Sequence, residues 1–381
     1  MLMGLPLFLL FAVYGVVNAY LPILLRDLGY SATMIGVLQG VFEAAGLAFP
    51  LFVSARVDRR GNYGIVMIAL GLLMVAVLPA LAFAHSPWIT AAALAVFAVG
   101  FKGAVPVADA LVSRRLGANN SNYGKIRVMG SIGFVCMALL LQFTPLVDPA
   151  KPSSIAFWIA VPALLFALSI VAIPGLLKSY PHGPTSEKRE PISLKGFSPS
   201  FWFGFMLVFV AFLGMAPSQR FFSLYVREYL KLDSYAGLWA LSALAEVPFM
   251  FLSGKFIRRF GTERVLFVSL AAISVRNLVY AVFPTFGGAI AGQLFHSLCF
   301  GLFHPAAIVF VNERAPKRLL ALALTLYTSV SIGIASFVGN ILGGVVIDTL
   351  GYRALFVLFS VFPAIGCALC VRFREVFRTR N

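Results

Sequence analysis

A small set of ionisable side chains lies inside long apolar stretches of this sequence, where hydrocarbon or packed protein would surround them. A charged side chain at the centre of a membrane-spanning helix costs about 2.5–3.5 kcal/mol on insertion scales, so it is normally turned inward and marks a functional site. Such groups can bind a polar solute or carry a proton. The set comprises Glu43, Lys102, Asp109, Arg127, Arg220, Glu246, Arg276, His296 and His304.

The spacing of these residues places several of them on shared helix faces. Lys102 and Asp109 are seven positions apart, and Gln39 and Glu43 are four apart, so each pair lies along one face of its helix. Asp109 and Arg127 lie at equal depth on sequential spans, which predicts an ion pair. Buried pairs are often purely structural, but groups of both signs at similar depth in both halves favour a polar cavity.

The elements that position these residues are membrane spans. Hydrophobic residues make up 60% of the chain, charged residues 12%, and the mean hydropathy is +0.93; a soluble domain carries about 25% charged residues. Apolar stretches of roughly 20 residues, long enough to cross a bilayer, occupy 7–25, 33–55, 63–84, 88–113, 124–145, 154–176, 200–226, 234–255, 264–283, 286–312, 318–346 and 352–372. The sequence predicts an all-α membrane protein with twelve transmembrane helices.

The two halves of the chain repeat each other. Matched pairs are Arg59 with Arg259, Gly61 with Gly261, Ser131 with Ser331 and, one residue out of that register, Phe101 with Phe300 and Pro106 with Pro305. We therefore expect two pseudo-symmetric six-helix bundles, 1–176 and 200–381, joined by a cytoplasmic linker at 177–199. Two similar halves are typical of transporters that rock one half against the other around a central site.

The net charge of +16 reports topology. Most Lys and Arg residues fall in alternate loops, and this bias predicts that both termini and the linker are cytoplasmic. The basic side suits anionic lipid headgroups of the cell membrane, and nucleic acid is not implied. The Lys and Arg residues on the opposite side are Arg26, Lys151, Arg227, Lys231 and Arg353.

A basic turn follows the second span and recurs after the eighth. Asp58, Arg59 and Arg60 precede Gly61, and Arg259 is the repeat counterpart of Arg59. One interpretation is a conformational latch that contacts neighbouring helix ends in one state. The alternative is ordinary positive-inside charge; Asp58 favours the latch for the first copy, whereas the second copy favours neither.

These features resemble the major facilitator superfamily, and more narrowly its 3-phenylpropionate permease-like branch, distantly related to lactose permease. The resemblance covers nearly the whole chain, and the Tyr-Gly-Lys-x-Arg-x-x-Gly-Ser run with Glu-x-Pro on span eight is its most specific part. The residues that carry it are Tyr14–Gly15, Tyr20–Pro22, Leu28–Ala32, Asp109–Ala110, Tyr123–Ser131, Ala245–Pro248, Val275–Arg276 and Leu294–His296.

The resemblance implies roles for individual residues. Asp109 and Arg127 match the carboxylate and the arginine that bind sugar in lactose permease, and Phe134 falls where that protein stacks a tryptophan on the sugar ring. Arg276 and His296 match two members of its proton-coupling network.

Departures from that pattern change the expected chemistry. Cys299 stands where the network has its proton-binding glutamate, Gln293 stands where it has a lysine, and the span-eight carboxylate is displaced by one turn to Glu246. A carboxyl group in low dielectric holds its proton more firmly than one in water and releases it when water or a cation approaches. Glu43 and Glu246 are therefore the proton-carrier candidates.

We expect a secondary active transporter that moves a small organic solute by alternating access, with proton symport. The predicted substrate-binding residues suit an aromatic or other carboxylate or a sugar; they are Gln39, Lys102, Asp109, Arg127 and Phe134. The predicted proton-coupling residues are Glu43, Glu246, Arg276 and His296.

Two alternatives stay open: efflux of amphipathic compounds by proton antiport, and a membrane-embedded enzyme. The second is disfavoured because no His/Asp/Glu cluster has metal-ligand spacing and no Gly-x-Ser-x-Gly elbow occurs. No metal, cofactor or nucleotide-binding loop is expected.

Overall fold

The computed structural model describes residues 2–116, 123–178, 196–316 and 319–378, with side chains undescribed at positions 2, 48–56, 58, 59, 321, 328, 329 and 378. The chain divides into two compact units. Unit 1 comprises Met1–Glu187 with Ser234–Ala240, and unit 2 comprises Lys188–Asp233 with Leu241–Asn381. Most of the predicted 177–199 linker lies outside the described residues.

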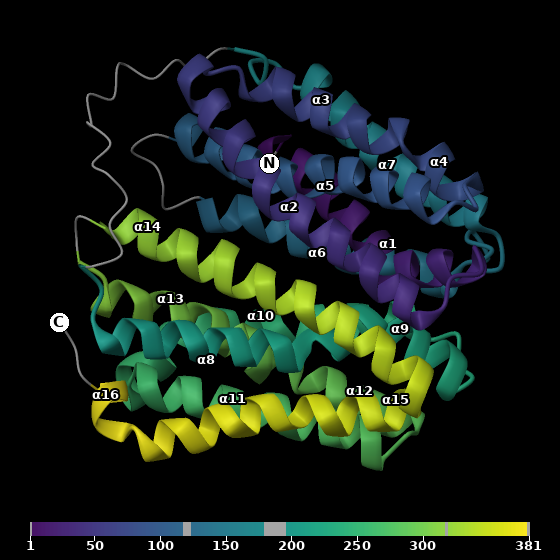
Figure 1. Cartoon of the computed structure of the whole chain (residues 1–381). Helices are drawn as coiled ribbons and strands as arrows, with labels where there is room; N and C mark the ends of the chain where they lie inside the picture. The colour runs from purple at the N-terminus through teal and green to yellow at the C-terminus, as the bar shows by residue number, and fades with distance from the viewer. Residues whose placement is uncertain (1, 117–122, 179–195, 317–318, 379–381) are drawn as a thin grey trace. The chain divides into compact units, whose positions relative to one another are not determined.

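Unit 1 is built from helices drawn in purple to blue in Figure 1. Helix α1 packs against α6 and α7, α2 against α5, and α3 against both α5 and α7. The helices of unit 1 are η1 (Leu2–Gly4, a 3₁₀ turn), α1 (Leu5–Asp27), α2 (Ala32–Arg60), α3 (Tyr63–Ala76), α4 (Leu78–Phe83), α5 (Pro87–Leu116), α6 (Tyr123–Phe143) and α7 (Pro152–Ala172).

Unit 2 holds the teal to yellow helices, several of them interrupted by π-helical turns. Helix α15 packs against α8 and α11. The helices are α8 (Pro199–Ala216), η4 (Pro217–Phe221), α9 (Phe222–Leu224), η5 (Tyr225–Tyr229), α10 (Tyr235–Phe260, whose first residues belong to unit 1), α11 (Thr262–Val282), α12 (Phe286–Leu294), η6 (Ser297–Leu302), α13 (Phe303–Arg314), α14 (Leu320–Thr325), η8 (Leu326–Ser331), α15 (Ile332–Arg372) and α16 (Arg374–Arg378).

Helix ends follow local sequence signals. Ser31 caps α2 by accepting a hydrogen bond from the Met34 amide at 3.2 Å, and Ser198 caps α8 through the Phe201 amide at 3.3 Å. Gly61 ends α2 in the left-handed region, with φ 68°. Glycine adopts this conformation without the steric cost that a side chain adds, which explains why α2 ends at Gly61.

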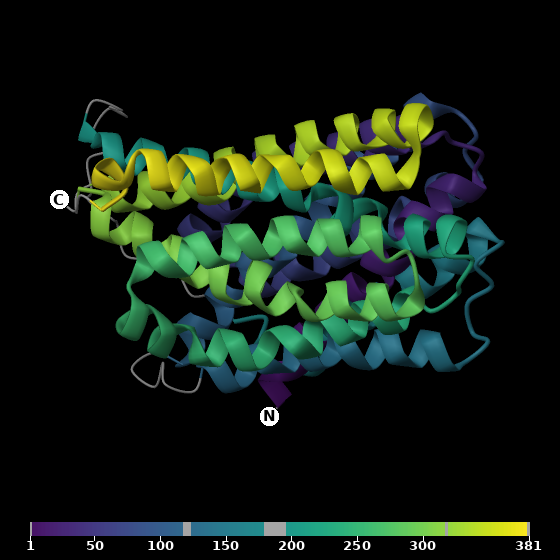
Figure 2. The same cartoon turned by 90° about the horizontal axis from the view of Figure 1, so that it is seen from below.

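Ten described helical segments are long and apolar enough to cross a membrane, and Ala32–Leu47 of α2 is a shorter apolar helix. Helix α15 contains two arms, because Gly351 has non-helical angles (φ 82°, ψ 176°) and the chain reverses there. Figure 2 shows the two arms as yellow ribbons. The all-α membrane fold is confirmed; the count of twelve spans stays a prediction.

Candidate functional site

In unit 1, the side chains of Glu43 and Lys102 meet between α2 and α5. The Lys102 ammonium donates to Glu43 Oε2, the Glu43 side chain is 5% exposed, and the Lys102 side chain is 23% exposed. The ammonium also lies 5.3 Å from the centre of the Phe42 ring. Gln39 is buried one turn before Glu43. The structure thus pairs Glu43, a predicted proton carrier, with Lys102, a predicted substrate-binding residue.

The predicted ion pair between α5 and α6 is present. Arg127 Nε lies 3.5 Å from Asp109 Oδ1, and both side chains are about one-third exposed. The guanidinium carbon of Arg127 lies 4.3 Å from the centre of the Phe11 ring, a cation–π contact. Both members of this pair are therefore partly accessible from outside the protein.

A row of aromatic rings connects the two ion pairs of unit 1. Tyr14 stacks on Phe11 at 5.1 Å and on Phe101 at 3.8 Å, and Phe101 contacts Phe42 at 5.6 Å. The row therefore has Arg127 against its first ring and Lys102 against its last. Phe134 is 8% exposed, so a role in stacking on a solute stays a prediction and requires its ring to be uncovered.

In unit 2, three of the four predicted proton-coupling residues form one chain of contacts. Arg276 Nη1 lies 3.0 Å from His296 Nδ1, and His296 Nε2 lies 3.4 Å from Glu246 Oε2. The residues come from α11, from the turn between α12 and η6, and from α10. A histidine side chain therefore links a cation to a carboxylate.

The chemistry of these contacts fixes the state of His296. A guanidinium is only a donor, so Nδ1 must offer its lone pair to Arg276 and Nε2 must carry the ring proton. The Nε2–H then points at Glu246, which accepts. In this arrangement His296 is neutral, and a second proton on its ring would break the contact with Arg276.

Arg276 is a buried cation held by neutral groups. The residue is 1% exposed, its Nη2 donates to Gln293 Oε1 at 2.9 Å, and its Nε donates to the Tyr280 hydroxyl at 3.2 Å. Within the described part of the chain it contacts no carboxylate directly. Because a buried charge without a counter-charge is strongly unfavourable, the carboxylate beyond His296 is the group that balances it.

A ladder of parallel rings continues from this chain of contacts. His296 stacks on Phe300 with 5.7 Å between ring centres, and Phe300 stacks on His304 with 5.3 Å. His304 Nδ1 lies 3.3 Å from the Tyr327 hydroxyl. The ladder shows that His304 packs beside the predicted site.

The latch prediction stays untested. The side chains of Asp58 and Arg59 lie outside the described ones, and Arg60 is exposed. Arg259 is exposed too, with its guanidinium carbon 5.3 Å from the centre of the Phe260 ring.

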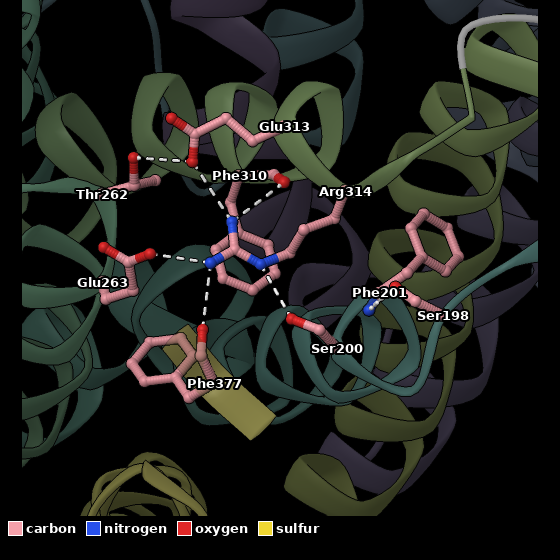
Figure 3. A network of polar contacts seen from close by, with 9 residues as sticks. All are labelled: Ser198, Ser200, Phe201, Thr262, Glu263, Phe310, Glu313, Arg314 and Phe377. Atoms are coloured by element: carbon pink, nitrogen blue, oxygen red, sulfur yellow. Dashed lines mark hydrogen bonds and ion pairs between the residues drawn. The ribbon is translucent and has the colours of Figure 1, made fainter. Parts of the chain in front are cut away.

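Sequence reasoning missed a buried cluster around Arg314, which Figure 3 shows. Arg314 is fully buried at the end of α13; it donates to Glu263 Oε1 at 2.7 Å, Glu313 Oε2 at 3.2 Å, Ser200 Oγ at 2.8 Å and the Phe377 carbonyl at 3.0 Å. The cluster ties α8, α11, α13 and α16 together.

The internal repeat could have pointed to this cluster, because two of its residues align with a contacting pair in the first half. Arg314 lies two hundred residues after Arg114, and Glu263 lies two hundred after Tyr63. In unit 1 the guanidinium carbon of Arg114 lies 4.9 Å from the centre of the Tyr63 ring. The same two positions thus make a cation–π contact in one unit and a buried ion pair in the other.

Apolar spanning helices with paired charges in their interior define a multi-pass membrane protein of the transporter class. The chain belongs to the major facilitator superfamily: residues 1–358 match the MFS_1 like family. The expected resemblance is confirmed.

Named relatives agree with this assignment. A maltose permease of Geobacillus stearothermophilus is 26% identical over 98% of this chain and 94% of its own length. A probable 3-phenylpropionic acid transporter of Escherichia coli is 24% identical, with 93% of each chain covered. A crystal structure of a mutant of the nucleoside transporter NupG has the same fold, with a TM-score of 0.85, 16% identity and 99% of each chain covered.

Proposed function

We propose that this protein is a proton-coupled transporter that moves a small polar organic solute across the cell membrane by alternating access. The observation that carries the proposal is the chain of contacts from the buried Arg276 through His296 to Glu246, both of which are partly buried. The net charge of a carboxylate, a neutral imidazole and a cation in such surroundings changes when one proton binds.

The proton acts on the balance of charge around Arg276. While Glu246 is ionised, it accepts from His296 and balances the buried guanidinium. A proton taken up by Glu246 removes that negative charge and leaves Arg276 uncompensated, which raises the free energy of this state relative to an alternative one. Binding of a proton and the change of conformation are thereby linked.

Glu43 is the second proton candidate and differs in its surroundings. Its carboxylate is paired directly with the Lys102 ammonium, and a directly paired carboxylate gives up this stabilisation when it is protonated. We therefore assign the proton to Glu246 and assign Glu43 to orienting Lys102.

The solute site proposed in unit 1 consists of Asp109, Arg127 and the Phe11 face. The carboxylate accepts from hydroxyl or amino groups, the guanidinium donates in pairs to carboxylate or hydroxyl oxygens, and the ring row offers an apolar surface. A ring-bearing solute with hydroxyl or carboxylate groups fits these contacts. The relatives are named for maltose, nucleosides and 3-phenylpropionic acid, and all three solutes have this chemistry.

Orientation and direction complete the proposal. We propose that both termini are cytoplasmic, because Lys and Arg gather in the loops on their side. One relative, from Escherichia coli, is named as a sugar efflux transporter. The experiment therefore applies the pH gradient in both directions and determines whether the solute is imported or exported.

The test is uptake into proteoliposomes with and without an imposed pH gradient, for a panel of sugars, nucleosides and aromatic carboxylates. Wild-type protein should accumulate one of these solutes only when the gradient is present. Glu246→Gln should abolish accumulation while solute exchange continues, because the binding site is intact and the coupling carboxylate is lost. Normal proton-driven accumulation by this variant would reject the assignment.

A further inference from the structure

Each unit contains a place where one charged side chain crosses a helix at a glycine. In unit 1, a methyl group at Gly46 of α2 would overlap Lys102 Cδ and would lie 3.1 Å from both Cγ and Cε. The aliphatic stem of Lys102 therefore runs over Gly46, and this path brings the ammonium to Glu43.

In unit 2, the crossing uses the opposite member of the helix pair. A methyl group at Gly301 of η6 would lie 3.2 Å from Glu246 Cγ, 3.2 Å from the Glu246 carbonyl oxygen and 3.4 Å from Phe249 Cβ. Here the charged side chain belongs to α10, and the glycine belongs to the helix that carries His296.

The two crossings occupy matching positions of the repeat. Gly46 and Glu246 each lie fifteen residues before the glycine that ends their helix, and that glycine has a φ of 68° in α2 and 83° after α10. Lys102 and Gly301 each lie four residues before a proline. One repeat position thus holds Gly46 in unit 1 and Glu246 in unit 2, and the other holds Lys102 in unit 1 and Gly301 in unit 2. In both units a charged side chain crosses the partner helix at a glycine.

We propose that Gly46 and Gly301 are positioning residues of the transport site, each leaving space for one charged side chain to cross and so fixing where its charge lies. Their effect on coupling rests on the transport function proposed above. The geometric claim does not depend on that function: the glycine sets the position of the Lys102 ammonium in unit 1 and of the Glu246 carboxylate in unit 2.

The consequence of adding a methyl group differs from that of an ordinary helix substitution. Alanine in place of glycine within a helix is normally stabilising. At Gly46 the obstructed atoms belong to a flexible side chain, so Lys102 moves aside and its ammonium leaves Glu43 while the helices stay in place. At Gly301 one of the tight contacts is with the Glu246 carbonyl oxygen, so the Glu246 residue must shift by a few tenths of an ångström.

The experiment compares Gly46→Ala and Gly301→Ala with two matched controls, Gly103→Ala and Gly287→Ala. Added methyl groups at the control positions would meet other atoms only at 3.7 Å and 3.9 Å. In proteoliposomes Gly301→Ala should lower pH-driven accumulation severalfold while solute exchange continues, because a small misplacement of a functional group slows the step that it serves. Gly46→Ala displaces Lys102, a predicted substrate-binding residue, so it should raise the KM for solute exchange and lower accumulation at low solute concentration. Both controls should match wild type.

Two further measurements keep the proposal testable whatever the transport result. Reaction of Lys102 with an amine-directed reagent, followed by peptide mass spectrometry, should be faster in Gly46→Ala than in wild type. In a Lys102→Ala background, Gly46→Ala should leave the unfolding midpoint unchanged or raised, because the obstructing stem is gone.

The outcomes separate the two claims. If wild type shows no response to a pH gradient, the proposed function fails, while Lys102 reactivity still tests the positioning claim. If wild type responds and both test variants accumulate solute like their controls with unchanged Lys102 reactivity, the positioning claim is overturned.

Discussion

At the scale of single residues, the neighbours of His296 decide what it does. Its Nδ1 accepts from Arg276 and its Nε2–H faces Glu246. The hydrogen bond from Arg276 requires the neutral ring, because Nδ1 must offer its lone pair. His296 therefore links a cation to a carboxylate, and we propose that the transported proton binds to Glu246.

This assignment predicts a difference between two substitutions at His296. A glutamine side chain can accept from Arg276 through Oε1 and donate to Glu246 through Nε2, but it does not titrate. His296→Gln should therefore retain pH-driven accumulation within about tenfold of wild type, whereas His296→Ala should lose it, since a buried cation and a carboxylate are then left unlinked. Proteoliposome uptake at matched protein density measures both.

An equal loss of pH-driven accumulation in the two variants would contradict this assignment and would indicate that His296 carries the proton. Comparison of their unfolding midpoints controls for a simple loss of folding, because only the alanine variant leaves a cavity beside Arg276.

A second prediction at this scale concerns the half-exposed pair Asp109 and Arg127. If both contact the solute, Asp109→Asn and Arg127→Gln should each raise the KM for exchange, and the double variant should lose less than the product of the two effects because the residues share one network. Exchange kinetics in proteoliposomes give all four values. Unchanged KM values would show that the pair is structural.

At the scale of helices, the sequence predicted the spans better than the way their residues meet. The Asp109–Arg127 pair was predictable because depth is readable from sequential spans joined by a short loop. The Glu43–Lys102 pair was not predicted, since these residues lie on helices two and four and hydropathy gives no rotation of a helix about its axis. The Arg314 cluster was missed for another reason: the positive-inside bias already explained a basic residue beside a loop, so Arg314 was not considered as a buried residue.

The Arg314 cluster should be a main source of stability for unit 2. Arg314→Gln leaves the Glu263 carboxylate, which is 16% exposed, without its cation and should lower the free energy of unfolding by about 3–5 kcal/mol. Denaturant titration in mixed micelles measures this change. Arg372→Gln is the matched control, because Arg372 is exposed and exposed substitutions change stability by about 0.5 kcal/mol or less.

A shift of the same size in both arginine variants, or none in Arg314→Gln, would contradict a stabilising role for the cluster. Arg314→Lys should recover part of the loss, since it restores the charge without the fork of donors that reaches Ser200 and Phe377.

Helix α15 gives a prediction about a turn. Gly351 has φ 82° and ψ 176°, a region open essentially to glycine alone, and an added methyl group there would meet nothing within 4 Å. Gly351→Ala should therefore cost about 1–3 kcal/mol through backbone strain alone. Gly124→Ala, equally unobstructed but helical, should be neutral or stabilising. Equal unfolding midpoints for the two variants would contradict the strained turn.

At the scale of the whole molecule, the internal repeat explains both what was predictable and what was not. Matching glycines and prolines placed the helices of both units in register. The functional side chains differ between the units: Lys102 lies where the other unit has Gly301, and Glu246 lies where the first has Gly46. Composition and periodicity predict the helices that both units share. That a charged residue and a glycine contact each other at opposite repeat positions in the two units can be recognised only from the side-chain contacts.

The chain belongs to a transporter family and carries a partly buried carboxylate linked through His296 to a buried cation, so its central property should be the movement of a proton together with a solute. The most direct measurement records internal pH in proteoliposomes while solute flows in down its own gradient, with no pH gradient imposed. Wild-type protein should acidify the lumen as solute enters, and Glu246→Gln, which keeps exchange but loses coupled net transport, should leave the internal pH unchanged. Solute entry through wild-type protein with constant internal pH would contradict the account.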